Sequence, residues 1–206
     1  LPVPGEHIAI PYERTSLPGY FFRAPGALPG EPRGLVVLNN GSDTVTSEMF
    51  LRGGAAAAAR GHHWMTFDGP GQQAALVDQG LRSRPDWEAV LTPVFDAMAA
   101  RADVDAERIA VIGVGEAGLL VPRALAFEHR FAAAAVDPGV IDAATSWTAP
   151  LPRRMQEALV RGEDELFDRD MHVAHLFAPE TRTLLEARAM PYGGLNGSAY
   201  DLFARV

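Results

Sequence analysis

The sequence contains neither cysteine nor lysine, and each absence removes a class of chemistry. Without cysteine the chain has no disulfide, no thiol nucleophile and no thiolate ligand for a metal. Arginine supplies all 18 basic residues, so Schiff-base and other lysine-dependent mechanisms are excluded. No stretch approaches the roughly 18 consecutive apolar residues of a membrane span, so we expect no membrane partner.

The start of the chain lacks an initiator Met, and it has neither the basic nor the apolar part of a signal peptide. We therefore expect a cytoplasmic protein and a chain that is part of a longer one. The formal net charge of −8 at pH 7 argues against nucleic-acid binding, because phosphate contacts need a basic face. A small-molecule substrate is the expected partner.

Apolar runs and turn residues alternate along the first 149 residues, which predicts strands and helices in turn. Helices are expected at residues 47–60, from Asp86 to about Arg101, and from the glycine-rich turn at 113–118 to about His129. Turn residues are expected at 16–19. The expected strands cover residues 7–11, 20–23, 34–38, 64–67, 109–112 and 132–136.

This alternation predicts an α/β fold with a doubly wound, mostly parallel sheet over residues 1–149. Residues 150–206 contain no further strand run rich in Val and Ile, and we expect them to form a helical cap or lid. The sheet therefore ends before its last expected strands. Ligands of such sheets bind at the carboxyl ends of the strands.

The turn Gly113-Val114-Gly115-Glu116-Ala117-Gly118 matches two different motifs. It matches the dinucleotide fingerprint G-x-G-x-x-G, with Asp137 as the ribose-binding acid at the end of the next strand. It also matches the strand-to-helix turn that exposes the nucleophile of α/β-hydrolases, with Gly115 at the nucleophile position. Against the dinucleotide interpretation, two strand–helix units precede the turn, and Glu116 places a carboxylate beside the expected pyrophosphate.

Two further loops follow strands at the spacing that favours the hydrolase interpretation, and they carry a resemblance to a known family. Residues 39–43 are Asn-Asn-Gly-Ser-Asp, residues 68–72 are Asp-Gly-Pro-Gly-Gln, and residues 121–124 are Val-Pro-Arg-Ala. The chain resembles the α/β-hydrolase branch that contains fermentation-respiration switch protein-like esterases, dihydroxypseudo-oxynicotine hydrolases and fungal polyketide-shortening hydrolases. The resemblance implies an α/β-hydrolase fold, no cofactor, a small apolar carbonyl compound as substrate and, as is frequent in these families, a homodimer.

The resemblance also implies a Ser-Asp-His triad, and this sequence departs from it at the serine. Gly115 stands at the nucleophile position, and no strands follow that could supply the Asp and the His. The implied oxyanion donors are the backbone N–H of Glu116 and one from Gly41, Ser42 or Asp43.

Three outcomes stay open for a chain without the serine. The protein is a non-catalytic binder, an enzyme for non-covalent chemistry such as C–C cleavage, elimination or cyclisation, or an enzyme that uses Glu116 as a base. A carboxylate in the first turn of a helix is also simply favourable, because it faces the positive end of the helix dipole.

Other residues have a structural and a functional interpretation side by side. Asp68 in its Asp-Gly-Pro-Gly turn is expected to fix the loop by accepting backbone hydrogen bonds. Asp137 is either an alternative catalytic acid or a turn cap. His172 and His175 are spaced to share one helix face and are candidate substrate contacts from the lid. No metal site is expected, since no metal-binding signature surrounds these histidines.

Overall fold

The computed structural model describes residues 4–195 and 198–204. The chain forms two compact units, Leu1–Val140 and Ile141–Val206. The first unit holds the sheet, and the described part of the second unit contains helices and no strand. The predicted boundary after residue 149 lies further along the chain, beyond helix α5 (Ala143–Thr148).

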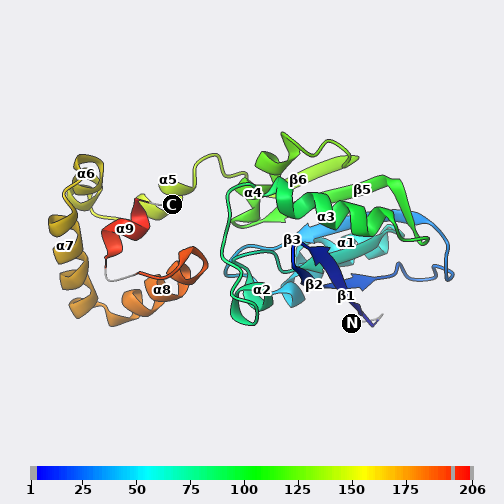
Figure 1. Cartoon of the computed structure of the whole chain (residues 1–206), viewed down its shortest axis with the longest axis horizontal. Helices are drawn as coiled ribbons and strands as arrows, with labels where there is room; N and C mark the ends of the chain where they lie inside the picture. The colour runs from blue at the N-terminus through cyan, green and yellow to red at the C-terminus, as the bar shows by residue number, and fades with distance from the viewer. Residues whose placement is uncertain (1–3, 196–197, 205–206) are drawn as a thin grey trace. The chain divides into compact units, whose positions relative to one another are not determined.

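Six strands of the described residues form one sheet, and the prediction of a mostly parallel sheet is confirmed (Figure 1). Strands β1 and β2 form an antiparallel hairpin, and β2 pairs antiparallel with β4. Strands β4, β3, β5 and β6 run parallel. The order across the sheet is β1-β2-β4-β3-β5-β6, with bounds β1 Glu6–Tyr12, β2 Thr15–Phe22, β3 Arg33–Asn39, β4 His63–Phe67, β5 Val104–Val114 and β6 Ala133–Asp137.

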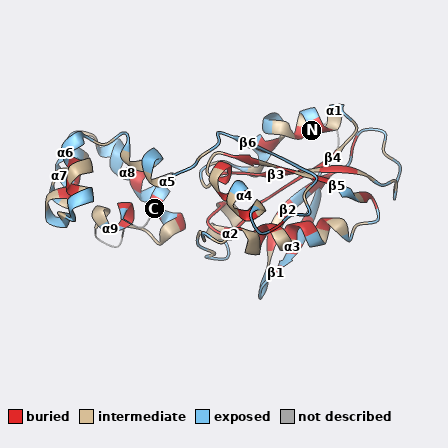
Figure 2. Cartoon of the chain, turned by 90° about the horizontal axis from the view of Figure 1, so that it is seen from above, coloured by how far each residue is buried: buried red, intermediate tan, exposed pale blue. Residues whose placement is uncertain are grey.

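Both faces of the sheet are covered, because the buried strands carry apolar residues at odd and even positions alike. In β3, Leu35 and Val37 join one core cluster, whereas Leu38 joins another. Helices α3 (Glu88–Ala99) and α4 (Ala117–Leu125) cover the first face, and α1 (Ala55–Ala59) lies over the second. Figure 2 shows the sheet between α1 and α3.

The prediction of one continuous helix over residues 47–60 is wrong. The segment forms a 3₁₀ turn (Thr46–Glu48), a π-helical turn (Phe50–Gly54) and then α1. Gly53 is non-helical there (φ 167°, ψ −26°), and a Cβ on it would come within 2.8 Å of Leu38 Cδ2. The close approach of this segment to β3 therefore breaks the helix, which local sequence does not reveal.

Three other local predictions differ from the structure. Residues 16–19 belong to β2, and the hairpin turns at residues 13–14, where Glu13 adopts a φ of 47°. Asp86 does not cap α3, since its carboxylate binds Arg84 instead. Helix α4 ends at Leu125, before His129, and the short helix α2 (Gln73–Val77) was not predicted.

The second unit packs its helices around a small apolar core of its own. Phe167 is fully buried there, and Trp147 packs at the edge of the same cluster. The described elements after α5 are α6 Arg153–Arg161, α7 Asp164–Phe177, α8 Pro179–Ala189, the 3₁₀ turn Met190–Tyr192 and α9 Ala199–Phe203.

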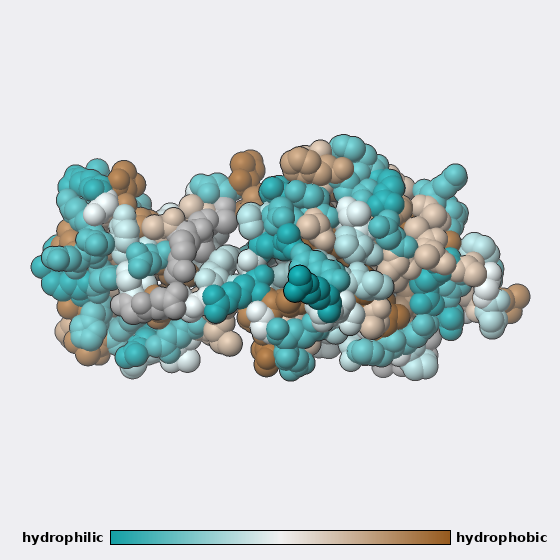
Figure 3. Space-filling model, viewed as in Figure 1, coloured by the Kyte–Doolittle hydropathy of each residue, from teal (hydrophilic) through white to brown (hydrophobic). Residues whose placement is uncertain are grey.

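Figure 3 shows hydrophilic residues over most of the visible face of each unit, with hydrophobic residues in small separate areas. Leu51, Ile141 and Phe177 are among the exposed large apolar side chains. Among the described residues, no helix has both the length and the apolar character to cross a membrane.

Candidate functional site

The candidate site lies where β5 turns sharply into α4. Gly115 occupies the turn with a φ of +65°, and its N–H donates to Asp137 O at 2.8 Å. The flanking glycines are required by space, since a Cβ on Gly113 would overlap Ala117 O and one on Gly118 would overlap Pro138 O. Such a tight turn after a strand is the geometry of a nucleophile elbow.

Position 115, which the sequence predicts to be the nucleophile position, has room for a side chain. An ideal Cβ on Gly115 would lie 3.7 Å from Gly41 Cα and 4.0 Å from Thr44 Oγ1, which are ordinary contacts. The positive φ is the remaining obstacle to an L-residue, and it costs about 1–2 kcal/mol. The structure thus has space for a side chain at position 115, where the sequence has glycine.

The loop after β3 faces the start of α4. An ideal Cβ on Gly41 would come within 3.2 Å of Glu116 N and 3.3 Å of Val114 O. A side chain at position 41 would therefore press on the backbone at Val114 and Glu116, next to Gly115. The amino end of α4 also favours negative charge, because its first N–H groups and its dipole point that way. This arrangement suits a carbonyl oxygen or an oxyanion.

A buried polar network holds the Gly41 loop in place. Asn40 Nδ2 donates to Asp68 Oδ1 and to Thr44 O, both at 3.0 Å. Gln72 Nε2 donates to Asn40 O at 2.6 Å, and Gln72 Oε1 accepts from Gly69 N at 2.8 Å. Asn40, Asp68 and Gln72 are all buried, so the loops after β3 and β4 are tied together out of water.

Burial raises the pKa of the Asp68 carboxyl above its ordinary value, and the hydrogen bonds from Asn40 and Ala74 act in the opposite direction. Asp68 Oδ2 accepts from Ala74 N at 3.3 Å, near the start of α2. Asp68 therefore holds its loop through one side-chain and one backbone donor.

The predicted site residues do not all come together. Gly41 and Gly115 lie in direct apposition, with Glu116 N beside them. Ser42 is placed in the same loop, where its O accepts from Gln73 Nε2 at 3.2 Å, and the next residue, Asp43, is exposed. Asp137 contributes its backbone oxygen to the elbow, and it is exposed at the end of β6.

His172 and His175 lie on α7 in the second unit and line one pocket of about 610 Å³ together with Arg182 and Glu186. Burial, with the nearby Arg182 charge, lowers the pKa of His175. The described residues contain no group of three or more His, Asp or Glu side chains arranged to hold a metal ion.

Thr44 is the site residue that the sequence did not indicate. It directly follows the Asn-Asn-Gly-Ser-Asp loop, and its hydroxyl faces both ideal Cβ positions, 3.4 Å from that of Gly41 and 4.0 Å from that of Gly115. A hydroxyl residue at the end of a loop that follows a buried strand was the available signal. Only the folding of the loop back onto the elbow gives this hydroxyl its place.

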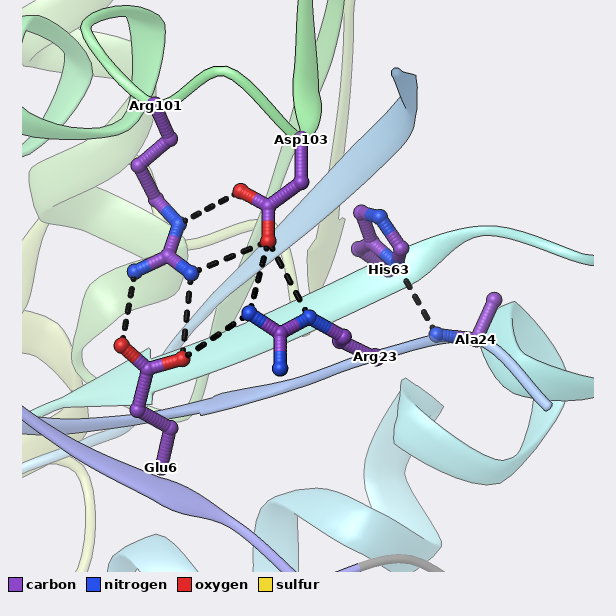
Figure 4. Close-up of polar contacts among 6 residues, drawn as sticks. All are labelled: Glu6, Arg23, Ala24, His63, Arg101 and Asp103. Atoms are coloured by element: carbon purple, nitrogen blue, oxygen red, sulfur yellow. Dashed lines mark hydrogen bonds and ion pairs between the residues drawn. The ribbon is translucent and has the colours of Figure 1, made fainter. Parts of the chain in front are cut away.

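A second polar cluster lies at the amino ends of the parallel strands, away from the elbow (Figure 4). His63 opens β4, accepts from Ala24 N at 2.8 Å through Nδ1, and has its pKa lowered by burial. Asp103, just before β5, accepts from Arg101 Nε at 2.9 Å. Because ligands of open α/β sheets bind at the opposite ends of the strands, this cluster serves stability.

The strand order and the elbow define an α/β-hydrolase fold. A dinucleotide-binding domain has the order 3-2-1-4-5-6 and its glycine-rich turn after the first strand, whereas here the turn follows β5 of β1-β2-β4-β3-β5-β6. The dinucleotide interpretation of Gly113, Gly115 and Gly118 is therefore not supported. No family model matches the chain.

Relatives agree with this fold. The chain is 37% identical over 139 residues to hydrolyase ccsE of Aspergillus clavatus, covering 64% of this chain and 32% of that protein. It is 34% identical over 139 residues to α/β hydrolase psoB of Aspergillus fumigatus, covering 63% and 31%. The crystal structure of 2,6-dihydroxy-pseudo-oxynicotine hydrolase matches with a TM-score of 0.57 at 24% identity, covering 64% of this chain and 36% of that one.

These similarities support the α/β-hydrolase branch that the sequence resemblance indicated. The matched region spans about one third of the length of these curated relatives.

Proposed function

We propose that the protein binds the carbonyl group of a small apolar compound at the elbow and acts on it without a covalent serine intermediate. The observation that carries the proposal is the apposition of Gly41 to Glu116 N beside the vacant position of Gly115. This apposition leaves space for a carbonyl oxygen near the amino end of α4, where negative charge that develops on it is favoured.

The proposed reaction is hydrolysis of an ester or of an activated C–C bond with water as the nucleophile. The water oxygen bonds to the carbonyl carbon, the bond to the leaving group breaks, and the leaving group takes one proton of the water. Gly115 offers no atom for an acyl-enzyme. Glu116 and Asp137 are the two candidates for transferring the proton to the leaving group, because they flank the elbow in the fold.

The test is turnover of 4-nitrophenyl esters and of aryl β-diketones by the wild-type protein and by Gly41→Val. We expect turnover without a burst, unaffected by serine-directed fluorophosphonates, and lost in Gly41→Val because the valine side chain fills the space between the Gly41 loop and the elbow. Glu116→Gln and Asp137→Asn then show which carboxylate moves the proton. Labelling of the wild-type protein by the fluorophosphonate, or full activity of Gly41→Val, contradicts the proposal.

The second candidate function is a non-catalytic binder of the same ligands, which is favoured by the loss of the nucleophile itself. Saturable binding of the esters without any turnover, again abolished by Gly41→Val, identifies this function.

We also propose that the second unit acts as the lid of this site, with His172 and His175 as substrate contacts. Their shared pocket, which lies wholly within the second unit, supports only that the two histidines can contact one ligand. His172→Ala is expected to raise KM and leave kcat within about twofold, as loss of uniform binding does. The cytoplasmic location and the homodimer are proposals too. Cell fractionation tests the location, and size-exclusion chromatography with light scattering tests the homodimer.

A further inference from the structure

The space vacated at Gly115 is bordered by one side-chain hydroxyl. Thr44 Oγ1 lies 4.0 Å from the ideal Cβ of Gly115 and 3.4 Å from the ideal Cβ of Gly41. An oxygen one bond further out than that Gly115 Cβ can approach Thr44 Oγ1 to the usual O–H···O distance of about 2.7 Å. The hydroxyl is therefore within reach of a ligand oxygen that lies beside the ideal Cβ position of Gly115.

The hydroxyl is held in position through the backbone of its own residue. Thr44 O accepts from Asn40 Nδ2 at 3.0 Å, and Asn40 is fully buried. The same Nδ2 donates to Asp68, which in turn is fixed by Ala74 N. A hydroxyl positioned in this way can donate to a developing charge with little reorganisation.

We propose that Thr44 is a catalytic residue whose Oγ–H donates a hydrogen bond to the carbonyl oxygen of the bound compound, and more strongly to the oxyanion formed from it. The inference rests on the proposed function and adds a side-chain donor to the backbone N–H of Glu116.

The variants Thr44→Val and Thr44→Ser separate the hydroxyl from the shape of the residue. Loss of one hydrogen bond to a charged oxygen lowers kcat/KM by about 10- to 100-fold, so we expect this loss in Thr44→Val, mainly in kcat. Thr44→Ser keeps the hydroxyl and is expected to stay within about threefold of wild type. Thr46→Val, two residues further along in the following 3₁₀ turn, is the matched control and should leave kcat/KM unchanged.

A binding experiment gives a readout that does not depend on turnover. An aryl trifluoromethyl ketone, followed by ¹⁹F NMR, presents a polarised carbonyl or its hydrate to the site. We expect Thr44→Val to weaken its binding about tenfold or more, Thr44→Ser to preserve it and Gly41→Val to abolish it. Circular dichroism of each variant shows that the fold is retained.

The outcomes distinguish the two proposals. If Gly41→Val abolishes binding and turnover while Thr44→Val equals wild type, the role of Thr44 is overturned and the carbonyl site stands. If the ketone does not bind the wild-type protein and no ester is turned over, both proposals are overturned. If Thr44→Ser loses as much as Thr44→Val, the shape of the residue matters and the hydroxyl donor is refuted.

Discussion

The ion pair between Glu128 and Arg130 gives the sharpest prediction about stability. Glu128 follows helix α4, the helix that begins at the elbow, and its side chain is only 5% exposed. Arg130 donates to it from Nε at 2.8 Å and from Nη2 at 2.6 Å, and Thr92 Oγ1 of α3 donates at 2.9 Å. This carboxylate therefore links the segment after α4 to α3.

These hydrogen bonds, with those from Arg130 first in importance, lower the pKa of Glu128 from 4.5 to about 2. A change of this size corresponds to about 3.4 kcal/mol between the two protonation states. Because the Arg130 side chain is 47% exposed, solvent screens part of the interaction, and we expect Glu128→Gln to lower the free energy of unfolding by about 1–2 kcal/mol at pH 7.

The pH dependence has a defined sign. The folded protein binds this proton less readily than the unfolded protein, so the stabilisation is complete above about pH 4.5 and is lost as the pH falls toward 2. Urea unfolding at pH 7, 4 and 3, followed by circular dichroism, should show the difference between wild type and Glu128→Gln shrinking with falling pH. Glu107→Gln, at an exposed position of β5, is the control. An equal difference at pH 7 and pH 3 would refute the reasoning.

Two further predictions concern the elbow and its supporting loop. Gly118→Ala should lower the free energy of unfolding by about 2–3 kcal/mol in urea, because the new Cβ overlaps Pro138 O. Gly115→Ala has space for its Cβ and should lower it by only about 1–2 kcal/mol, the cost of a positive φ in an L-residue. Equal decreases for the two variants would contradict the steric argument. Burial raises the pKa of Asp68, so the folded protein holds this proton more tightly than the unfolded protein does. The wild type should therefore lose stability relative to Asp68→Asn as the pH rises above about 3.8, which thermal melts from pH 4 to 8 can measure. A constant or falling difference would show that the hydrogen bond from Asn40 outweighs burial.

The elbow and its neighbouring loops could be located from the sequence, because their signals are local. Gly113, Gly115 and Gly118 mark a strand-to-helix turn by their spacing, and each proves to have a steric or dihedral reason for being glycine. The loop at Gly41 was predicted because polar residues follow an apolar run. What these local signals could not give is which atoms of the two loops meet.

The sequence by itself determined the α/β class and the parallel strands, since apolar periodicity is a property of the chain. Only the tertiary structure decided that Gly53 interrupts the first helix, because Leu38 of β3 approaches it, and that Thr44 faces the elbow. Both depend on contacts between segments far apart in the sequence. Such contacts are set by packing and by the buried Asn40–Asp68–Gln72 network, which no local pattern encodes.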